Sequence, residues 1–298
     1  MDAAEKVYRF YERYRGEKFV YGRSAAGQPL VGFHVGGHGY PQVIAQYAIH
    51  AREWVTSLLA LGHVGRAESG CFCSRGDRGG VSVANKDLCG GVYILPLTNP
   101  DGAALALRGE SFLRTLSKER AAFLEEINGG KDFSLWKANA EGVDLNVNFP
   151  ARWGTGKSNV FLPASQNFVG SAPLCAPESA ALAAFTEKVR PAATVSFHTK
   201  GREIYWEFFQ KGESTARDAR IARALSEETG YAVRKTPSSA GGYKDWCVET
   251  FGIPAFTVET GDDGLAHPLG EDAFPAIWQE NAGVPNRLIE ELIAWKKR

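Results

Sequence analysis

The residues of this chain with the clearest chemical meaning are a histidine and a glutamate in close spacing. His50 and Glu53 lie three positions apart, a separation at which one turn directs both side chains to the same side. An imidazole and a carboxylate placed in this way can chelate a metal ion. A catalytic zinc ion typically has a third protein ligand and a fourth position for water, and His198 is the natural candidate for that third ligand. Taken singly, each of these residues can equally be a structural residue with an ordinary partner.

Two further residues would complete a hydrolytic centre around such a metal. Zinc lowers the pKa of its bound water to about 7, and a carboxylate beside it can take the proton as the water attacks a carbonyl. Glu259 follows a short apolar segment and suits this role, the alternative being a salt-bridged acid at the start of a loop. The negative charge that develops on the carbonyl oxygen needs a second cation, for which Lys137 is the best placed. These residues predict metal-assisted hydrolysis of a peptide or amide bond.

The segments that must position these residues alternate between strand and helix patterns. Apolar segments predict strands at 42–49, 92–97, 193–197 and 255–258, and amphipathic segments predict helices at 3–15, 54–66, 177–190 and 271–297. We expect a break in the last helix near Pro285 and a turn at residues 99–102. The pattern predicts an α/β fold with a single domain: a mixed, mostly parallel twisted sheet with helices on both faces. The residues that directly follow predicted strands, where open α/β sheets bind ligands, are His50, Asn99, His198 and Glu259.

Composition limits the classes of function. The 298 residues are 44% hydrophobic and 23% charged, which favours one globular domain spanning residues 1–298. Thirty-four basic residues balance thirty-four acidic ones, so no bulk charge attracts nucleic acid. No run approaches the roughly 18 apolar residues of a membrane helix, and the first residues do not resemble a secretion leader. We therefore expect a cytoplasmic protein with neither nucleic acid nor membrane as a partner, the alternative being a secreted protein whose natural sequence carries a leader.

The remaining candidate motifs carry little chemistry. Five cysteines are an odd number and fit a reducing compartment, and Cys71, Cys73 and Cys89 stay open as a second metal site or a surface loop. Residues 156–158 are similar to the end of a phosphate-binding loop, but Ala151 stands where that motif requires glycine. No nucleophile elbow of a serine hydrolase is present. The histidines that lack such partners are predicted to be structural or surface residues, namely His34, His38, His63 and His267.

Five motifs in order along the chain resemble the zinc carboxypeptidase family. They are His50-Ala51-Arg52-Glu53-Trp54, Leu97-Thr98-Asn99-Pro100-Asp101-Gly102, Gly142-Val143-Asp144-Leu145-Asn146, Phe197-His198 and Phe256-Thr257-Val258-Glu259. Residues 22–30 also look like that family's early hairpin. The resemblance implies that one Zn²⁺ is held by His50, Glu53 and His198, that Glu259 is the general base, and that Asn146 touches the substrate's carboxylate.

Three departures from the family pattern limit which of the family's activities we expect for this chain. Digestive members carry an arginine after the asparagine that binds the substrate carboxylate, and this chain has Val147. A charged hydrogen bond is worth about 1.5 to 3 kcal/mol, so its loss predicts a roughly 10- to 150-fold weaker grip on an ordinary C-terminus. Lys137 stands where the family has the arginine that assists the oxyanion. The position of the family's mobile tyrosine falls on Pro237, with Tyr243 as a neighbouring phenol.

A second set of motifs resembles the bacterial branch that cleaves γ-D-glutamyl-meso-diaminopimelate bonds in cell-wall peptides. They are Trp136-Lys137-Ala138-Asn139, Asn146-Val147-Asn148-Phe149, His198-Thr199-Lys200-Gly201 and Gly242-Tyr243-Lys244-Asp245-Trp246. Lys244 falls near the floor of the family's specificity pocket, where its ammonium could pair with the distal carboxylate of diaminopimelate or simply lie in solvent. The residues expected to bind substrate are Arg52, Asn146, Tyr243 and Lys244.

These resemblances imply a zinc metallopeptidase that acts on a muropeptide or another peptide, with residues 1–298 as the catalytic domain and no wall-binding module. Three alternatives stay open. A conventional carboxypeptidase would bind the terminal carboxylate through Asn146 and another cation such as Arg202. A zinc deacylase would act on a small amide, and an inactive relative would only bind peptides.

Overall fold

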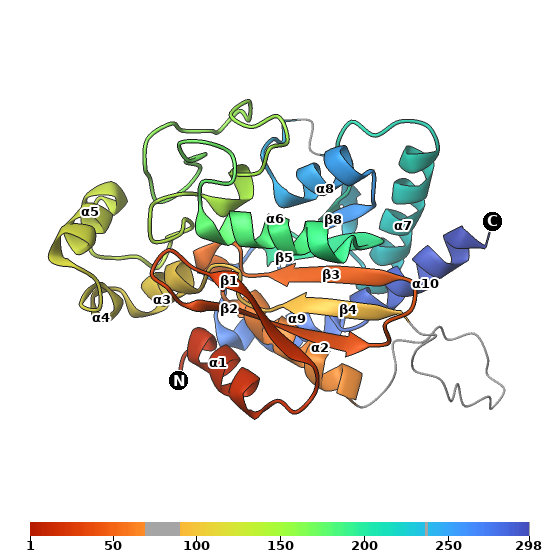
Figure 1. The fold of residues 1–298 in the computed structure, drawn as a ribbon, viewed down its shortest axis with the longest axis horizontal. Helices are drawn as coiled ribbons and strands as arrows, with labels where there is room; N and C mark the ends of the chain where they lie inside the picture. Colours follow the sequence, from red (N-terminus) through yellow and green to blue (C-terminus); the bar gives the residue numbers. More distant parts are fainter. Residues whose placement is uncertain (69–89, 236–237, 298) are drawn as a thin grey trace.

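One twisted sheet runs through the centre of the molecule (Figure 1). The computed structural model describes residues 1–68, 90–235 and 238–297. Its strands are β1 (Lys18–Arg23), β2 (Pro29–Gly36), β3 (Gln42–Tyr47), β4 (Gly91–Leu95), β5 (Ala193–Thr199), β6 (Glu203–Tyr205), β7 (Ala232–Arg234) and β8 (Ala255–Thr260). Its helices are α1 (Ala3–Arg13), α2 (Val55–Glu68), α3 (Pro100–Arg108), α4 (Glu110–Leu113), α5 (Lys118–Asn128), α6 (Pro177–Val189), α7 (Glu213–Thr229), α8 (Tyr243–Phe251), α9 (Phe274–Asn281) and α10 (Val284–Lys296). Single 3₁₀ turns are η1 (Ala51–Glu53), η3 (Leu145–Val147) and η4 (Glu271–Ala273).

The sheet has a parallel centre and antiparallel additions. In the described part of the chain the strand order is β1-β2-β4-β3-β5-β8-β6-β7. The central pairs β4–β3, β3–β5 and β5–β8 are parallel, whereas the β1–β2 hairpin, β2–β4 and β8–β6 pair antiparallel. This arrangement confirms the predicted mixed sheet and the early hairpin. It also brings the carboxyl ends of β3, β5 and β8 together at one edge, where the predicted catalytic residues follow or end the strands.

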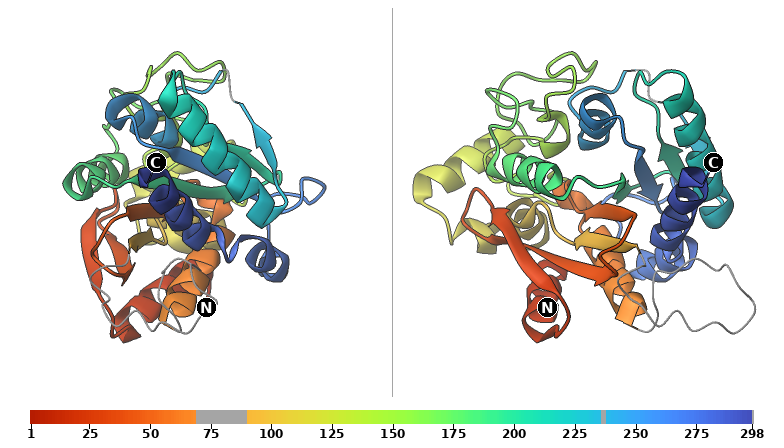
Figure 2. Two further views of the ribbon diagram at one scale, coloured as in Figure 1. Left: turned by 90° about the vertical axis from the view of Figure 1, so that its right-hand side faces the viewer. Right: turned by 45° about the vertical axis from the view of Figure 1, so that its right-hand side comes forward.

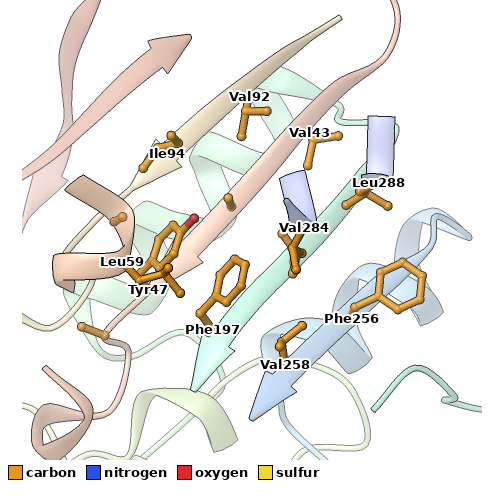
Figure 3. Packing of buried hydrophobic residues seen from close by; sticks show 14 of the residues in the cluster. Val43, Tyr47, Leu59, Val92, Ile94, Phe197, Phe256, Val258, Val284 and Leu288 are labelled. Atoms are coloured by element: carbon orange, nitrogen blue, oxygen red, sulfur yellow. The ribbon is translucent and has the colours of Figure 1, made fainter. Parts of the chain in front are cut away.

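Helices cover both faces of the sheet because alternate strand residues are apolar on both sides. Val43 and Tyr47 pack in one cluster with α2, α9 and α10, while Ile44 between them packs in another with α6 and α8. Figure 3 shows the first cluster, in which strand side chains meet Leu59 of α2 and Val284 of α10. Both views of Figure 2 show α10 running beside α7. Every residue of β5 is buried, as expected of a central strand.

Three element boundaries differ from those that the patterns predicted. Residues 99–102 do not form an isolated turn: Asn99 caps helix α3 by accepting from the Gly102 N–H, and Pro100 occupies the first turn. Strands β5 and β8 extend through His198 and Glu259. The break in the C-terminal helix precedes Pro285, which lies in the first turn of α10. No helix among the described residues has the length and apolar character required to cross a membrane.

A buried carboxylate on α6 ties the hairpin to the loop that carries Lys137. Glu178 accepts hydrogen bonds from the backbone N–H of Ala25 and from Nδ2 of Asn139, each at 2.9 Å. Burial nevertheless raises the pKa of Glu178 from 4.5 to about 7. In the folded protein this carboxyl therefore holds a proton over a pH range in which the unfolded chain has lost it.

We expect the free energy of unfolding to fall as pH rises from about 4.5 to 7, by up to about 3 kcal/mol from Glu178 alone. Between these values the folded state binds more protons than the unfolded state, so each rise in pH favours unfolding. Urea denaturation of the wild type and of Glu178→Gln across pH 5 to 8 measures the effect. The variant should be less stable than the wild type at every pH, because an amide has one acceptor oxygen for two N–H donors. Its free energy of unfolding should, however, change less with pH. An unchanged slope would contradict the assignment.

Candidate active site

Three residues of types that bind metal ions meet at the carboxyl ends of the parallel strands. His50 lies between β3 and η1, Glu53 ends η1, and His198 is the penultimate residue of strand β5. Nδ1 of His50 lies 2.9 Å from Oε1 of Glu53, and Nδ1 of His198 lies 2.9 Å from Oε2 of the same carboxylate. The two Nδ1 atoms are 3.1 Å apart. All three side chains are buried.

This donor set fits a zinc ion. Tetrahedral bonds of about 2.0 to 2.1 Å place ligand atoms roughly 3.3 Å apart, close to the three separations in the cluster. Burial would raise the pKa of Glu53, but the two imidazoles against it hold that pKa well below its ordinary value. Nε2 of His198 is buried and has no hydrogen-bond partner among the described residues, so the ring uses Nδ1 for its polar contacts. The cluster therefore has the composition and spacing of a His₂Glu metal site.

Asp144 links the cluster to the predicted oxyanion cation. Its Oδ1 lies 3.4 Å from Nε2 of His50, and its Oδ2 lies 2.9 Å from Nζ of Lys137. Burial alone would raise the pKa of Asp144, but the Lys137 ammonium and His50 together hold it well below its ordinary value. The carboxylate thus orients one imidazole and one ammonium at once. Sequence reasoning missed this role, because Asp144 stood inside a motif with nothing to indicate its complete burial.

We predict that Asp144→Asn weakens zinc binding by about 10- to 100-fold, the range typical for loss of a carboxylate behind a metal-ligating histidine. The amide cannot stabilise a positively polarised His50 ring as the carboxylate does. Competition with a chromophoric chelator measures the dissociation constant. Asp132→Asn is the matched control, because Asp132 is an exposed acid whose side chain accepts hydrogen bonds from Ser134. Equal zinc affinity in Asp144→Asn and wild type would contradict the prediction.

Strand pairing places Glu259, the candidate general base, beside the His50–Glu53–His198 cluster. His198 and Glu259 are direct partners in the parallel β5–β8 pair, so their side chains leave the sheet on the same face. Loss of surrounding water raises the pKa of Glu259 to about 7, and the neighbouring His198 and Lys137 oppose this rise. A carboxyl that titrates near neutral pH beside a metal-ligating group suits proton transfer at that pH.

The loop that carries Lys137 is fixed by main-chain contacts. The carbonyl of Lys137 accepts from the Ala51 N–H of η1 at 3.1 Å. Nδ2 of Asn99 donates to the carbonyls of Ile49 and Ala138, so one amide clamps the residue before His50 to the residue after Lys137. Asn99 is therefore a positioning residue, as its place after a strand suggested, although it does not belong to the metal cluster.

A cleft of about 250 Å³ opens beside these groups. Its lining residues are His50, Lys137, Asn146, Val147, Gly156, Lys157, Ser158, Asn159, Asn167, Ser238, Ser239 and Ala240. Asn146 and Val147 thus lie together on the wall, as the family motif implies. Lys157 supplies a cation that sequence reasoning did not assign to the site, because residues 156–158 were considered only as a phosphate loop.

Two of the predicted substrate residues have other contacts in the structure. Tyr243 is fully buried and its hydroxyl lies 2.8 Å from Oγ1 of Thr186, so the prediction that this phenol contacts substrate is wrong. Its backbone N–H instead donates to Oδ1 of Asn146 and orients that amide. Lys244 is not in solvent: its ammonium is buried and donates to Asp245 and to the carbonyl of Glu207. The packing of α8 against α6 explains the burial of Tyr243, whereas Lys244 lies against Glu207 and Phe208 in the segment after β6.

Arg52 and His267 lie near the site, whereas Arg202 is paired with other residues. Arg52 donates from Nη1 to the carbonyl of Leu135 at 3.2 Å and to Gln166 at 3.3 Å, which places it beside the Lys137 loop. His267, predicted as structural or surface, lies within electrostatic reach of Arg52 and Glu53, and burial lowers its pKa. Arg202, the alternative carboxylate cation, is already paired with Asp262 and Glu280.

Other predictions have mixed outcomes. His63 is a structural residue, bonded to the Tyr47 hydroxyl and the Asn281 carbonyl. His34 and His38 do have an acidic partner, Glu17, contrary to the prediction. The predictions for Cys71, Cys73, Cys89 and Pro237 concern residues outside the described part of the chain.

Comparisons with known proteins agree with this geometry. The family model described as zinc carboxypeptidase matches residues 13–283. Gamma-D-glutamyl-L-diamino acid endopeptidase 1 of Lysinibacillus sphaericus is 32% identical over 269 residues, which cover 88% of this chain and 64% of that protein. The uncharacterized protein YqgT of Bacillus subtilis (strain 168) is 30% identical over 268 residues, 88% of this chain and 69% of its own length. This chain thus spans about two thirds of each relative.

Solved structures give the same fold. Bovine thrombin-activatable fibrinolysis inhibitor superposes with a TM-score of 0.74 at 20% identity, covering 98% of this chain and 94% of that one. Murein-tripeptide amidase MpaA from Escherichia coli O157 superposes with a TM-score of 0.56 at 20% identity, covering 94% and 95%. At this identity the likeness is one of fold.

Proposed function

Because this chain belongs to the zinc carboxypeptidase family, we propose that it hydrolyses the γ-D-glutamyl-meso-diaminopimelate amide bond of cell-wall peptides. The chain is a metallopeptidase by its family. The observation that carries the choice of substrate is a cleft wall with Asn146 beside Val147, where a carboxylate-binding arginine is missing. The 32% identity to a protein named as an endopeptidase for γ-D-glutamyl-L-diamino acid bonds supports the same substrate class.

The proposed mechanism assigns one task to each group of the site. His50, Glu53 and His198 would hold a single zinc ion. When bound, zinc lowers the pKa of a coordinated water and polarises the substrate carbonyl. Glu259 accepts the proton of the attacking water and returns it to the leaving amine. The Lys137 ammonium stabilises the negative charge that develops on the carbonyl oxygen, and Asp144 keeps that ammonium beside the cluster.

Two lysines supply the cations that a diaminopimelate substrate needs. Diaminopimelate carries one carboxylate at the C-terminus of the substrate peptide and a second at its distal carbon. Lys157 lines the cleft and could pair with one of them in place of the missing arginine. Lys244 is not among the residues that line this cleft: its buried ammonium donates to Asp245 and to the Glu207 carbonyl and lies 5.5 Å from the centre of the Phe208 ring. We propose that its third N–H donor meets the other carboxylate.

Digestion of L-Ala-γ-D-Glu-meso-diaminopimelate, followed by mass spectrometry, tests the proposal. A conventional C-terminal peptide and a tripeptide with L-Lys in place of diaminopimelate serve as comparison substrates. We expect chelator-sensitive release of diaminopimelate and slow or no release from the other two. Cleavage of the conventional peptide alone would support ordinary carboxypeptidase activity instead, and cleavage of neither would favour a deacylase or a binding protein.

Two variants test the role of Lys244 in the same assay. Lys244→Met should reduce the preference for diaminopimelate over L-Lys. Lys235→Met is the matched control, because Lys235 also contacts Glu207 but lies exposed on the surface. Equal preferences in Lys244→Met and wild type would remove Lys244 from the recognition of substrate.

A further inference from the structure

A second group of metal-ligand side chains lies at the opposite edge of the sheet from the active site. Glu17 precedes β1, His34 lies in β2, and His38 lies in the loop after β2. His34 contacts Gln42, the first residue of β3, whereas His50 follows the other end of the same strand. One ligand atom from each of the three residues lies within 4.8 Å of the others.

The two imidazoles point to a single carboxylate oxygen. Oε2 of Glu17 lies 3.1 Å from Nδ1 of His34 and 3.2 Å from Nε2 of His38. The rings stack with centroids 4.4 Å apart and an interplanar angle of 16°. The His34 side chain is 1% exposed, whereas His38 and Glu17 are half exposed or more. The cluster is thus anchored on one buried ring and open to solvent on the other side.

The protonation of His34 follows from the amide next to it. Nε2 of Gln42 donates to the carbonyls of Gly37 and Gly39, and this fixes which end of the amide carries the oxygen. The amide oxygen of Gln42 therefore faces Nε2 of His34 at 3.0 Å, and that nitrogen must carry the proton. A neutral His34 then turns the lone pair of Nδ1 toward the Glu17 carboxylate. Two electron-rich atoms at 3.1 Å repel each other unless a second proton on Nδ1 or a metal ion lies between them.

The surroundings hold His34 in this orientation. A metal-ligating histidine commonly donates its second N–H to a carbonyl or carboxylate, which is the contact that Gln42 accepts. Gly91, the first residue of β4, leaves the space for this contact. A Cβ at Gly91 would lie 2.6 Å from Nε2 of His34 and 2.3 Å from the carbonyl oxygen of Gly37, so any other residue would displace the ring or the loop.

We propose that Glu17, His34 and His38 form a second binding site for a divalent transition-metal ion, with zinc as the best match. The separations of 3.1 and 3.2 Å agree with those of the His50–Glu53–His198 cluster, which has the same His₂Glu composition. Imidazole and carboxylate donors suit zinc, and three protein ligands leave a position for water or for a fourth ligand. This inference does not depend on the proposed substrate.

Zinc stoichiometry tests the proposal without reference to activity. Protein is stripped with a chelator, its accessible cysteines are alkylated so that thiols cannot bind metal, and bound zinc is counted by equilibrium dialysis. We expect two zinc ions per wild-type chain and one in His38→Ala and in Glu17→Gln. His50→Ala should also bind one, and the His38→Ala/His50→Ala double variant none. Glu12→Gln, which changes a neighbouring exposed acid, should keep two.

The outcomes separate this site from the active site. One zinc ion in the wild type that is lost in His50→Ala, or two ions retained in His38→Ala and Glu17→Gln, would overturn the proposal. A nitrogen-15 spectrum of the stripped protein at pH 8 provides a second test. It should show the His34 proton on Nε2 alone, with the His34 and His38 signals moving when zinc is added. Two protons on His34 and no shift with zinc would assign the contact to a simple ion pair with Glu17.

Discussion

Replacement of Glu259 by glutamine is expected to lower kcat by about 10²- to 10⁴-fold while zinc content stays the same. Glutamine preserves the shape of the side chain but cannot accept a proton from water. Glu259 is not one of the three clustered ligand residues, and its position is set by main-chain register with His198 rather than by its own charge. The measurement is kcat on L-Ala-γ-D-Glu-meso-diaminopimelate together with metal content by mass spectrometry.

Glu203 provides a matched control for this experiment. It is the direct partner of Glu259 in the antiparallel β6–β8 pair and is also a carboxylate near the site. Its oxygens are engaged by the Tyr205 hydroxyl and by Nε of Arg234, so it is not free to accept a proton from water. Glu203→Gln should therefore keep most of the activity. Similar losses in the two variants would indicate a general electrostatic effect and not a specific base.

Replacement of Lys137 by methionine is expected to lower kcat by about 10²- to 10³-fold, the usual effect of removing one stabiliser of a developing oxyanion. Methionine fills a similar volume without charge. Lys137→Arg keeps the charge and should recover part of the activity, although the planar guanidinium has a different geometry. The assay is kcat and KM on the tripeptide with zinc affinity measured in parallel, because Lys137 also pairs with Asp144.

Two other variants distinguish an effect of Lys137 on the reaction from effects on zinc binding or substrate binding. Asp144→Asn should lower zinc affinity, whereas Lys137→Met leaves the Asp144 carboxylate beside His50 and should lower mainly kcat. Lys157→Met changes another lysine of the same cleft and should raise KM more than it lowers kcat. If Lys137→Met changed only zinc affinity, Lys137 would be a positioning residue and not a stabiliser of the oxyanion.

The sequence by itself determined the early hairpin, the central strands, the helices α1, α2 and α6, the C-terminal helices and the residues that can carry the hydrolytic chemistry. Apolar strands at 42–49, 193–197 and 255–258 each lead to a polar residue, and parallel strands place their carboxyl ends at one edge. The proximity of His50, His198 and Glu259 could therefore be predicted from short segments alone. Local patterns are sufficient here because strand direction and register position these side chains.

Only the tertiary structure decided how the remaining charged and polar residues are used. Asp144 and Lys244 are buried by segments distant in the sequence, and that burial turned one into the partner of two cations and the other into a paired ammonium. The place of Lys157 in the cleft and the Glu17–His34–His38 cluster likewise depend on segments that meet only in the folded chain. The periodicity of a sequence reports which face of an element is apolar. It does not report which loops fold over that face, and this long-range packing sets the partners and pKa values of polar groups.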